Sequence, residues 1–183
     1  GCAIRADASE LAATGNLLAE SVSHGMSLTS CTRVEVVSNV IEQPGGRGVL
    51  ADRTETLRAV GNRLVSPSAG FWLTGGKSAT LVENEVAGSR ERGLFVSDAD
   101  EVIVGENDIR EAVQEGVYLV NVRAGAVAGN EILNAGNMGI RLDSCQGEAL
   151  LVASNHVDGA KSHALCFTAA RASAVGNVLK NGQ

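Results

Sequence analysis

Short apolar runs, some of which alternate with polar residues, recur along the whole chain, and glycine and asparagine separate them. Residues 34–36 and 150–152 form such runs ahead of an asparagine. A second set follows a glycine or its equivalent and covers residues 26–28, 49–51, 71–73, 94–96, 117–119, 140–142 and 165–167. A period of two with aliphatic residues, interrupted by Gly and Asn, predicts β-strands.

The strands belong to an internal repeat that eight asparagines mark. The gaps between them are 22 to 25 residues, and an aliphatic residue follows two positions after each one. The asparagines are Asn16, Asn39, Asn62, Asn84, Asn107, Asn130, Asn155 and Asn177. A glycine comes eight or nine residues after each of the first six, at Gly25, Gly48, Gly70, Gly93, Gly116 and Gly139, and the seventh repeat has His163-Ala164 instead. A constant period in the twenties indicates a solenoid.

The repeat length decides which solenoid is expected. Three short strands fit within each repeat, and the turns between them are too short for the helix that a leucine-rich repeat needs. We therefore predict an all-β fold: a single-stranded right-handed parallel β-helix of about eight coils, with 22–25 residues and three strands per coil. Asparagine tolerates the left-handed conformation of a tight bend, and its amide can bond to the asparagine of the next coil. The eight asparagines should then form an internal ladder at the strand spacing of about 4.8 Å.

The rhythm Gly-aliphatic-x-Leu … Val-x-x-Asn-x-Ile covers nearly the whole chain and resembles the right-handed parallel β-helix proteins of the pectate-lyase-like superfamily. The resemblance implies a polysaccharide or oligosaccharide partner bound along the glycine-led sheet. It also favours an extracellular or cell-surface location. Two enzyme signatures of the superfamily are missing, namely Asn-Thr-Asp with Gly-His-Gly of polygalacturonases and Asp-Pro-His-Asp of alginate epimerases.

Composition and charge narrow the alternatives. Apolar residues make up 44% of the 183 residues and aromatic residues only 3%, so the core must consist of Val, Leu, Ile and Ala. A net charge of −6 argues against a nucleic-acid partner. No apolar run is long enough for a membrane span. Residues 1–183 are expected to form one β-helix domain, and the unfinished coils at both ends suggest an excerpt of a longer protein.

Function must come from the side chains that point outward. The second residue after each glycine faces solvent, and this column contains Ser27, Leu50, Trp72, Phe95, Tyr118, Arg141 and Cys166. We predict that Leu50, Trp72, Phe95, Tyr118 and Arg141 bind the ligand, with the three aromatic rings accessible to solvent. Two alternatives stay open: the aromatic stripe is a protein interface, or the rings only stabilise one another by stacking.

Candidate catalytic residues lie at one end of this column. Tyr118, Arg141, Asp143 and His163 provide a base and a cation, which a uronate lyase or epimerase needs to remove a proton and stabilise an enolate. Such an enzyme is preferred over a glycoside hydrolase, because the acidic residues on alternate coils are about 10 Å apart. The alternative is a cation–π pair of Tyr118 and Arg141 with a salt bridge to Asp143.

Metal chemistry has weak support in the sequence. No Cys/His cluster indicates zinc, and no cofactor is expected. Asp98 and Asp100 offer two carboxylates to calcium, but two alone make a poor site, so a solvated acidic turn is the expected role.

A second apolar patch supports the rival function, a non-catalytic interaction or spacer solenoid. On the strands ahead of the asparagines, Ile103, Ala126 and Leu151 should point outward, with Ala124 and Ala149 beside them. We expect this patch to contact a protein partner or a second copy of the chain.

Overall fold

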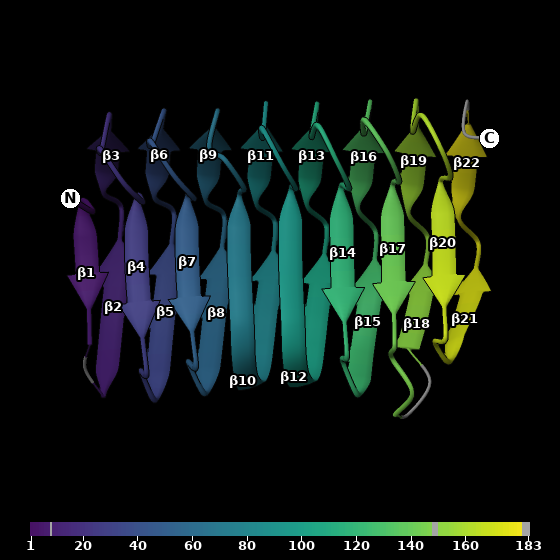
Figure 1. Ribbon diagram of the computed structural model, residues 1–183, viewed down its shortest axis with the longest axis horizontal. Coiled ribbons are helices and arrows are strands. Elements are labelled where there is room, and N and C mark those ends of the chain that lie inside the picture. Colours follow the sequence, from purple (N-terminus) through teal and green to yellow (C-terminus); the bar gives the residue numbers. More distant parts are fainter. Residues whose placement is uncertain (8, 148–149, 181–183) are drawn as a thin grey trace.

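The computed structural model describes residues 1–7, 9–147 and 150–180. Within this part of the chain every element is a strand, and all strand pairs are parallel. The coils are stacked side by side along one axis, with the N- and C-termini at opposite ends (Figure 1). The front strands run down, the back strands run up and the coils advance from left to right, which makes the solenoid right-handed (Figure 1). The predicted parallel β-helix is confirmed.

The glycine-led sheet forms the front of Figure 1 and carries the predicted ligand-binding column. It contains eight strands in sequential order along the axis. They are β1 (Ile4–Ala6), β4 (Met26–Thr29), β7 (Val49–Asp52), β10 (Phe71–Val82), β12 (Leu94–Gly105), β14 (Val117–Val120), β17 (Ile140–Asp143) and β20 (Leu165–Thr168).

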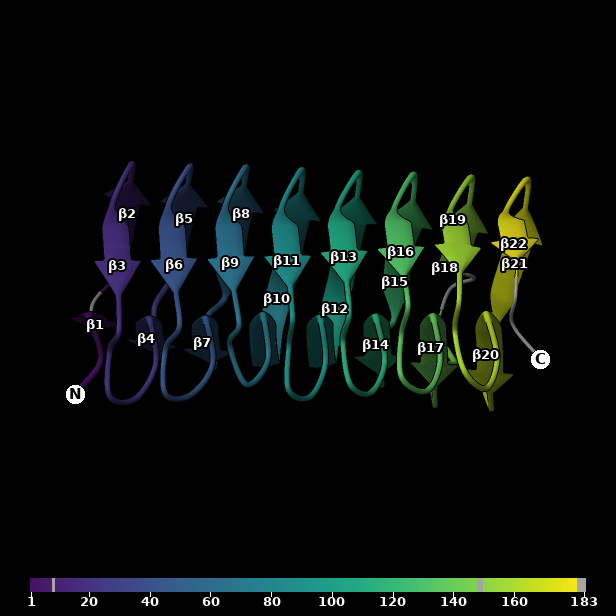
Figure 2. The same cartoon turned by 90° about the horizontal axis from the view of Figure 1, so that it is seen from above.

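Two further rows of strands complete each coil. The second row comprises β2 (Glu10–Thr14), β5 (Arg33–Val37), β8 (Thr56–Val60), β15 (Ala124–Ala128), β18 (Leu150–Ala153) and β21 (Ala172–Val175). The third comprises β3 (Leu17–Ala19), β6 (Val40–Glu42), β9 (Arg63–Val65), β11 (Glu85–Ala87), β13 (Asp108–Arg110), β16 (Glu131–Leu133), β19 (His156–Asp158) and β22 (Val178–Lys180). In two coils the first two strands merge into the 12-residue β10 and β12, which pair with both rows. Figure 2 shows the third-row strands from β3 to β19 each curving round to the next glycine-led strand.

A residue with left-handed backbone conformation marks the bend ahead of every ladder asparagine. It is the residue immediately before the asparagine, for example Ser38 with a φ of 54° and Glu83 with a φ of 56°. The expectation that the asparagine itself adopts this conformation is therefore wrong. Its side chain has another task, because it must point inward to meet the next coil.

The predicted asparagine ladder is present. Asn39, Asn62, Asn84, Asn107, Asn130 and Asn155 are at most 1% exposed. In each link the backbone N–H and the Nδ2 group of one asparagine donate to Oδ1 of the next, over 2.9 or 3.0 Å. The second amide hydrogen goes to a carbonyl of the preceding coil, as from Asn107 to Leu81 over 2.8 Å. These bonds satisfy polar groups that would otherwise be costly to bury.

The glycines and the aliphatic residues of the repeat contact each other. A Cβ on Gly93 would lie 2.4 Å from Cγ2 of Ile109 and 2.5 Å from the carbonyl oxygen of Gly116. The same crowding recurs at Gly25, Gly48, Gly70, Gly116 and Gly139. Glycine is needed there because the chain passes too close to the neighbouring coil for a side chain.

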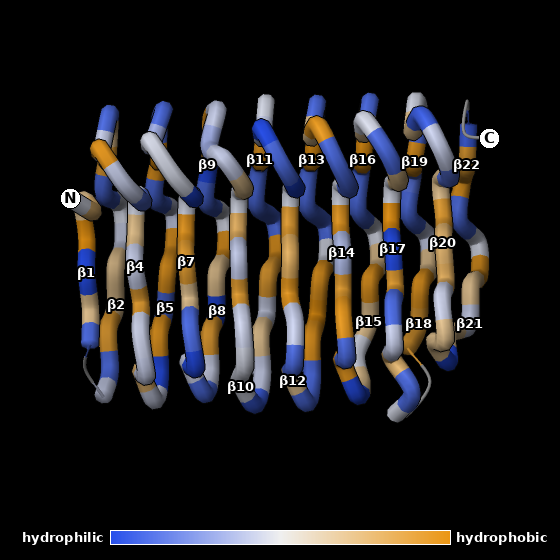
Figure 3. Tube along the Cα trace, viewed as in Figure 1, coloured by the Kyte–Doolittle hydropathy of each residue, from blue (hydrophilic) through white to orange (hydrophobic). Residues whose placement is uncertain are grey.

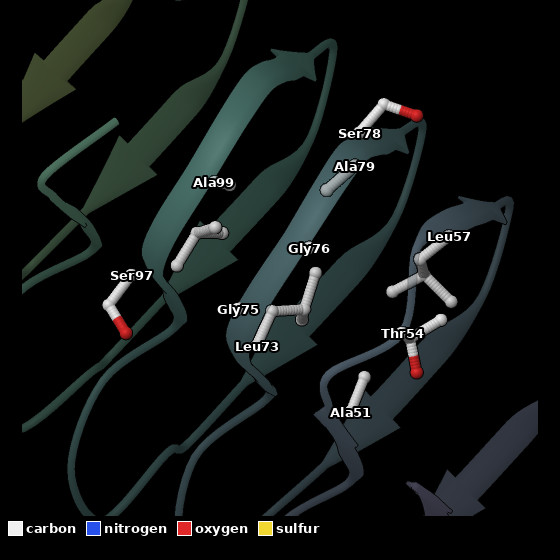
Figure 4. A pocket seen from close by; sticks show the side chains of 11 residues that line it. Ala51, Thr54, Leu57, Leu73, Gly75, Gly76, Ser78, Ala79, Ser97 and Ala99 are labelled. Atoms are coloured by element: carbon white, nitrogen blue, oxygen red, sulfur yellow. The ribbon is translucent and has the colours of Figure 1, made fainter. Parts of the chain in front are cut away.

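Inward-pointing aliphatic residues fill the coils between Ala6 and Ala164. In Figure 3 most strands carry orange, apolar segments, whereas blue segments concentrate at the bends. One corner is incompletely filled: a cavity of about 10 Å³ is lined by Thr54, Leu57, Leu73, Gly76 and Ala99, among others (Figure 4). The Thr54 hydroxyl is buried there without a hydrogen-bond partner among the residues that the structure describes. That volume is about what one water molecule needs.

Candidate functional site

Strand register places the predicted ligand-binding residues in one row. Leu50 of β7 pairs with Trp72 of β10, which pairs with Phe95 of β12. Phe95 pairs in turn with Tyr118 of β14, and Tyr118 with Arg141 of β17. The row runs along the solenoid axis on the outside of the glycine-led sheet, because the residues on either side of each member point into the core.

The aromatic rings of this row pack against one another. The centroids of Trp72 and Phe95 are 4.2 Å apart with their planes tilted by 38°, and those of Phe95 and Tyr118 are 5.5 Å apart in an edge-on arrangement. Trp72 and Tyr118 remain partly exposed, but Phe95 is only 9% exposed. The expectation of three accessible rings is therefore wrong for Phe95, because a ring on each side and a guanidinium group cover it.

A second column, which the sequence analysis missed, supplies that cover. It consists of the residue immediately before each glycine or its equivalent, and backbone bonds such as Gly25 N–H to the Arg47 carbonyl align its members. They are His24, Arg47, Ala69, Arg92, Glu115, Met138 and His163. The Arg47 guanidinium lies 4.0 Å from the Trp72 ring centroid. The Arg92 guanidinium lies between 5.1 and 5.5 Å from all three ring centroids.

These contacts change how a ligand meets Trp72. Arg47 belongs to the coil before Trp72 and Phe95 to the coil after it, so they cover opposite sides of the ring. The exposed part of Trp72 is therefore its edge. A sugar ring stacked on the Trp72 face would have to displace Arg47, and a ligand that leaves the stack intact contacts ring edges and guanidinium groups.

Glu115 is a buried carboxylate beneath this face. Its side chain is 3% exposed, and Oε2 accepts a hydrogen bond from Arg92 Nε over 2.8 Å. Asn137 donates to Oε1 over 3.0 Å, and Arg141 Nη1 lies 3.8 Å from the same oxygen. Glu115 thus fixes two of the arginines that pack on the aromatic rings. The position of Glu115 directly before a repeat glycine is the sequence signal that could have identified it.

Three of the four predicted catalytic residues lie together. Arg141 Nη2 donates to Asp143 Oδ2 over 3.1 Å, and the Tyr118 hydroxyl donates to the same oxygen over 3.3 Å. The Arg141 guanidinium is 4.6 Å from the Tyr118 ring centroid. Burial raises the pKa of Tyr118, and the lowering by Arg141 does not offset this. A raised pKa makes Tyr118 a weaker candidate for a base, and the carboxylate pairs the charge of Arg141.

His163, the fourth predicted catalytic residue, lies apart from this group. It is exposed, and its Nδ1 forms a hydrogen bond of 2.8 Å with Ser162 Oγ. It occupies the column ahead of the glycines, next to Met138 in the neighbouring coil. No hydrogen bond or ion pair in the described part of the chain joins it to Tyr118, Arg141 or Asp143.

At the Leu50 end of the row, the neighbouring residues His24 and Arg47 create a different charge environment. His24 Nδ1 accepts a hydrogen bond from the Arg47 backbone N–H over 3.0 Å. Burial and, secondarily, the Arg47 charge lower the pKa of His24. Burial also lowers the pKa of Arg47, against the opposite effect of Glu91. Among the described residues the buried Arg47 Nε has no hydrogen-bond partner and Arg47 forms no ion pair, so this end holds a poorly compensated cation.

The acidic residues considered for calcium already have partners. Asp98 Oδ1 accepts from Asn121 Nδ2 over 2.8 Å, and Asp100 Oδ1 accepts from Arg123 Nη1 over 3.1 Å. Within residues 1–7, 9–147 and 150–180, no three His, Cys, Asp or Glu side chains are grouped to hold a metal ion.

The second apolar patch also follows strand register. Ile103 pairs with Ala126, and Ala126 pairs with Leu151. Ile103 is 41% and Leu151 43% exposed, whereas Ala124 and Ala126 are half-buried. Ala149 lies outside the described residues. The three apolar side chains thus form an exposed row on the second row of strands.

Stacked parallel coils with an asparagine ladder and an aromatic–arginine row on the outer face define a β-helix repeat protein. Residues 3–183 match the family described as periplasmic copper-binding protein (NosD), and the chain belongs to this family. No curated protein and no solved structure matches the chain. The resemblance to the pectate-lyase-like superfamily thus stays a prediction. No helix in the described residues is long and apolar enough to cross a membrane.

Proposed function

We propose that the chain binds an extended glycan along the glycine-led sheet. The carrying observation is the axial row in which Trp72, Phe95 and Tyr118 follow one another on adjacent coils, with centroids 4.2 and 5.5 Å apart. Leu50 and Arg141 extend the row at its two ends. Neighbouring coils repeat at about 4.8 Å, so a polymer lying along the axis meets one side chain of the row on each coil.

The shape of the row favours a linear polymer over a folded protein as its ligand. The row is one side chain wide, and the polar residues Thr74 and Asp143 flank it two positions further along the strands. A stable protein interface buries about 800 Å² on each partner and needs a broader apolar centre. Ring edges carry partial positive charge and guanidinium groups donate hydrogen bonds, so the hydroxyl and ring oxygens of a glycan are suitable partners.

Binding without catalysis is the function we propose. A lyase or epimerase needs a base with a lowered pKa, whereas burial raises the pKa of Tyr118. Asp143 pairs the charge of Arg141, and His163 is engaged with Ser162. The periplasm, named in the family's description, is an oxidising compartment in which glycans of the cell envelope are accessible.

Copper does not enter this proposal, because no three His, Cys, Asp or Glu side chains are grouped to hold a metal ion in the described part of the chain. Copper sites in proteins are built from His, Cys and Met side chains. Met26 is fully buried in the core, and the buried thiols of Cys31 and Cys145 donate to backbone carbonyls. His24 uses Nδ1 for the Arg47 backbone, and His163 lies at the far end of the same column. No step of the proposed function passes through the metal.

Tryptophan fluorescence tests the proposal, because Trp72 is the only tryptophan of the chain. Titration with neutral and acidic polysaccharides is expected to shift its emission. Trp72→Ala should weaken binding, measured by calorimetry, about fivefold or more. Leu151→Ala, on the second row of strands, is the control and should bind normally. If no glycan binds, or if Trp72→Ala binds as well as the parent, the proposal is wrong.

Protein contact through the second patch is a separate candidate function. The observation that favours it is the exposure of Ile103 and Leu151, at 41% and 43%, in one row. Sedimentation of the chain over a range of concentrations tests self-association, and Ile103→Ser with Leu151→Ser should abolish it. A chain that stays monomeric at every concentration would remove a second copy as the partner.

A further inference from the structure

We propose that the ligand is anionic, and that its carboxylate or sulfate group binds between Arg47 and Arg92 at the exposed edge of Trp72. This inference rests on the proposed glycan-binding function and adds the chemical class of the ligand. Three observations carry it: the convergence of two guanidinium groups on one ring, the incomplete pairing of their charges, and the different state of Arg141.

The first observation is geometric. Arg47 and Arg92 lie two coils apart in the column ahead of the glycines, about 10 Å at strand spacing. The residue between them in this column is Ala69, whose small side chain is fully buried. Both guanidinium groups approach the ring of the intervening coil, at 4.0 Å and 5.5 Å from the Trp72 centroid. The two cations therefore flank the exposed edge of Trp72.

The second observation concerns charge. Arg47 forms no ion pair within 4 Å in the described part of the chain, and its buried Nε lacks a hydrogen-bond partner. Glu91 acts on it only through space. Arg92 uses Nε for Glu115, and no described hydrogen bond uses its two Nη groups. The protein thus leaves guanidinium donors free at this end, which an anionic group would accept.

The third observation is the contrast with Arg141. It also packs on an aromatic ring of the row, at 4.6 Å from the Tyr118 centroid. Its charge, however, is paired with Asp143 at 3.1 Å and lies 3.8 Å from Glu115. Arg141 and Arg92 therefore each have a carboxylate partner, whereas Arg47 forms no ion pair in the described part of the chain. This difference places the anion at Arg47, beside the Nη groups of Arg92 that no described hydrogen bond uses.

The guanidinium donors indicate the chemistry of the anionic group that they bind. A planar guanidinium matches the two oxygens of a carboxylate or sulfate in a bidentate arrangement. The edge of Trp72 is the positive part of its quadrupole and also favours an anion. A uronic acid or a sulfated sugar joins such a group to a ring, so acidic polysaccharides combine both features that the row offers.

The test compares an acidic and a neutral oligosaccharide of equal length, and adds a free anion. Calorimetry and Trp72 fluorescence would be followed with a tetrasaccharide of glucuronic acid, with cellotetraose as its neutral counterpart and with sodium sulfate as the free anion. We expect the acidic tetrasaccharide to bind at least about tenfold more tightly than either of the other two. Its affinity should fall as salt is raised, because the contact is a charge pair.

Variants locate the site on the surface. Arg47→Met keeps the side chain packed on Trp72 and should lower the affinity for the acidic tetrasaccharide about tenfold, with neutral binding unchanged. Arg47→Lys keeps the charge but not the planar, bidentate guanidinium, so its affinity for the acidic tetrasaccharide should lie between those of the parent and Arg47→Met. Arg63→Met, on β9 beside Glu42 and Glu85, is the matched control and should bind like the parent.

The outcomes separate this inference from the proposed function. Equal affinity for acidic and neutral tetrasaccharides, or an Arg47→Met variant that binds the acidic one normally, would overturn the anion site and leave glycan binding intact. Equal affinity for free sulfate and the acidic tetrasaccharide would overturn the glycan as the source of the anion. Absence of binding by both tetrasaccharides would overturn the proposed function and this inference together.

Discussion

The inside and the outside of the coils hold neighbouring coils together by different means. Inside, one residue type repeats: each buried asparagine donates to the next through bonds of the same length. Outside, on the glycine-led sheet, every coil contributes a different residue, and rings, guanidinium groups and carboxylates form unequal contacts. Regular chemistry stabilises the solenoid, and irregular chemistry gives one stretch of its surface a distinct charge. Four changes test this division.

Removal of one ladder amide should have the largest effect. Asn107→Leu removes the Oδ1 that accepts from both Asn84 donors and the Nδ2 that donates to the Leu81 carbonyl, whereas Asn130 Oδ1 keeps the backbone N–H at position 107. We expect unfolding in urea to show a loss of about 3 kcal/mol. Asp108→Asn changes the neighbouring exposed residue and should cost only a few tenths. Similar small losses in both variants would show that the ladder does not dominate the interior.

A change at Glu115 tests whether contacts on the outer face contribute to the stability of the fold. Glu115→Gln leaves Arg92 and Arg141 without the carboxylate that they share. Because the carboxylate is buried, the expected loss of unfolding free energy is about 2 kcal/mol. Glu131→Gln removes an exposed carboxylate 3.4 Å from Arg110 and should cost less than about 0.5 kcal/mol. Equal losses in the two variants would show that Glu115 contributes no more to stability than an exposed ion pair does.

Thr54 is an exception to the regular interior, since its buried hydroxyl lacks a partner. Thr54→Val removes that hydroxyl at nearly constant volume and should stabilise the protein by up to about 1 kcal/mol. Thr74→Val removes a hydroxyl that donates to Asp52 over 3.0 Å and should instead be destabilising. Thermal unfolding of the two variants measures whether each substitution raises or lowers the stability. A loss from Thr54→Val would mean that water in the cavity satisfies the hydroxyl.

Tyr118 should give the smallest effect and the clearest pH dependence. It is the only tyrosine of the chain, so ultraviolet absorbance titrates it alone. Burial raises its folded-state pKa above the ordinary value of 10.0, which favours the neutral phenol in the folded protein. The resulting stability is fully present below pH 10.0 and is lost as the pH rises through the raised folded value. Tyr118→Phe should abolish this dependence, and a titration at or below pH 10.0 would contradict it.

The sequence predicted the interior well because the interior repeats. The spacing of Asn84, Asn107 and Asn130 predicted the coil and the ladder, and the hydrogen bonds between the asparagines confirm both. Alternation after Gly70 predicted the outward direction of Trp72, which is partly exposed. The details of the bend were wrong, since Glu83 and Glu106 rather than the asparagines after them have positive φ.

The outer face was only partly predictable for a physical reason. The direction of Phe95 follows from the alternation of a strand, but its burial depends on where the long side chain of Arg92 reaches. Arg47, Arg92 and Glu115 occupy equivalent positions with different residue types, so no repeated residue drew attention to them. Their pairing follows from contacts between coils, which a one-dimensional pattern does not contain.

The ladder also gives the solenoid a direction. In each link the earlier asparagine donates and the later one accepts, as Asn39 does with Asn62 and Asn130 with Asn155. The amide dipoles therefore point the same way, and the two end faces of the ladder are chemically unlike. A coil designed to extend the stack beyond Asn177 must present an acceptor, whereas one placed ahead of Asn16 must present donors. Two such stacks can join their ladders head to tail, but the same link cannot form between two like ends.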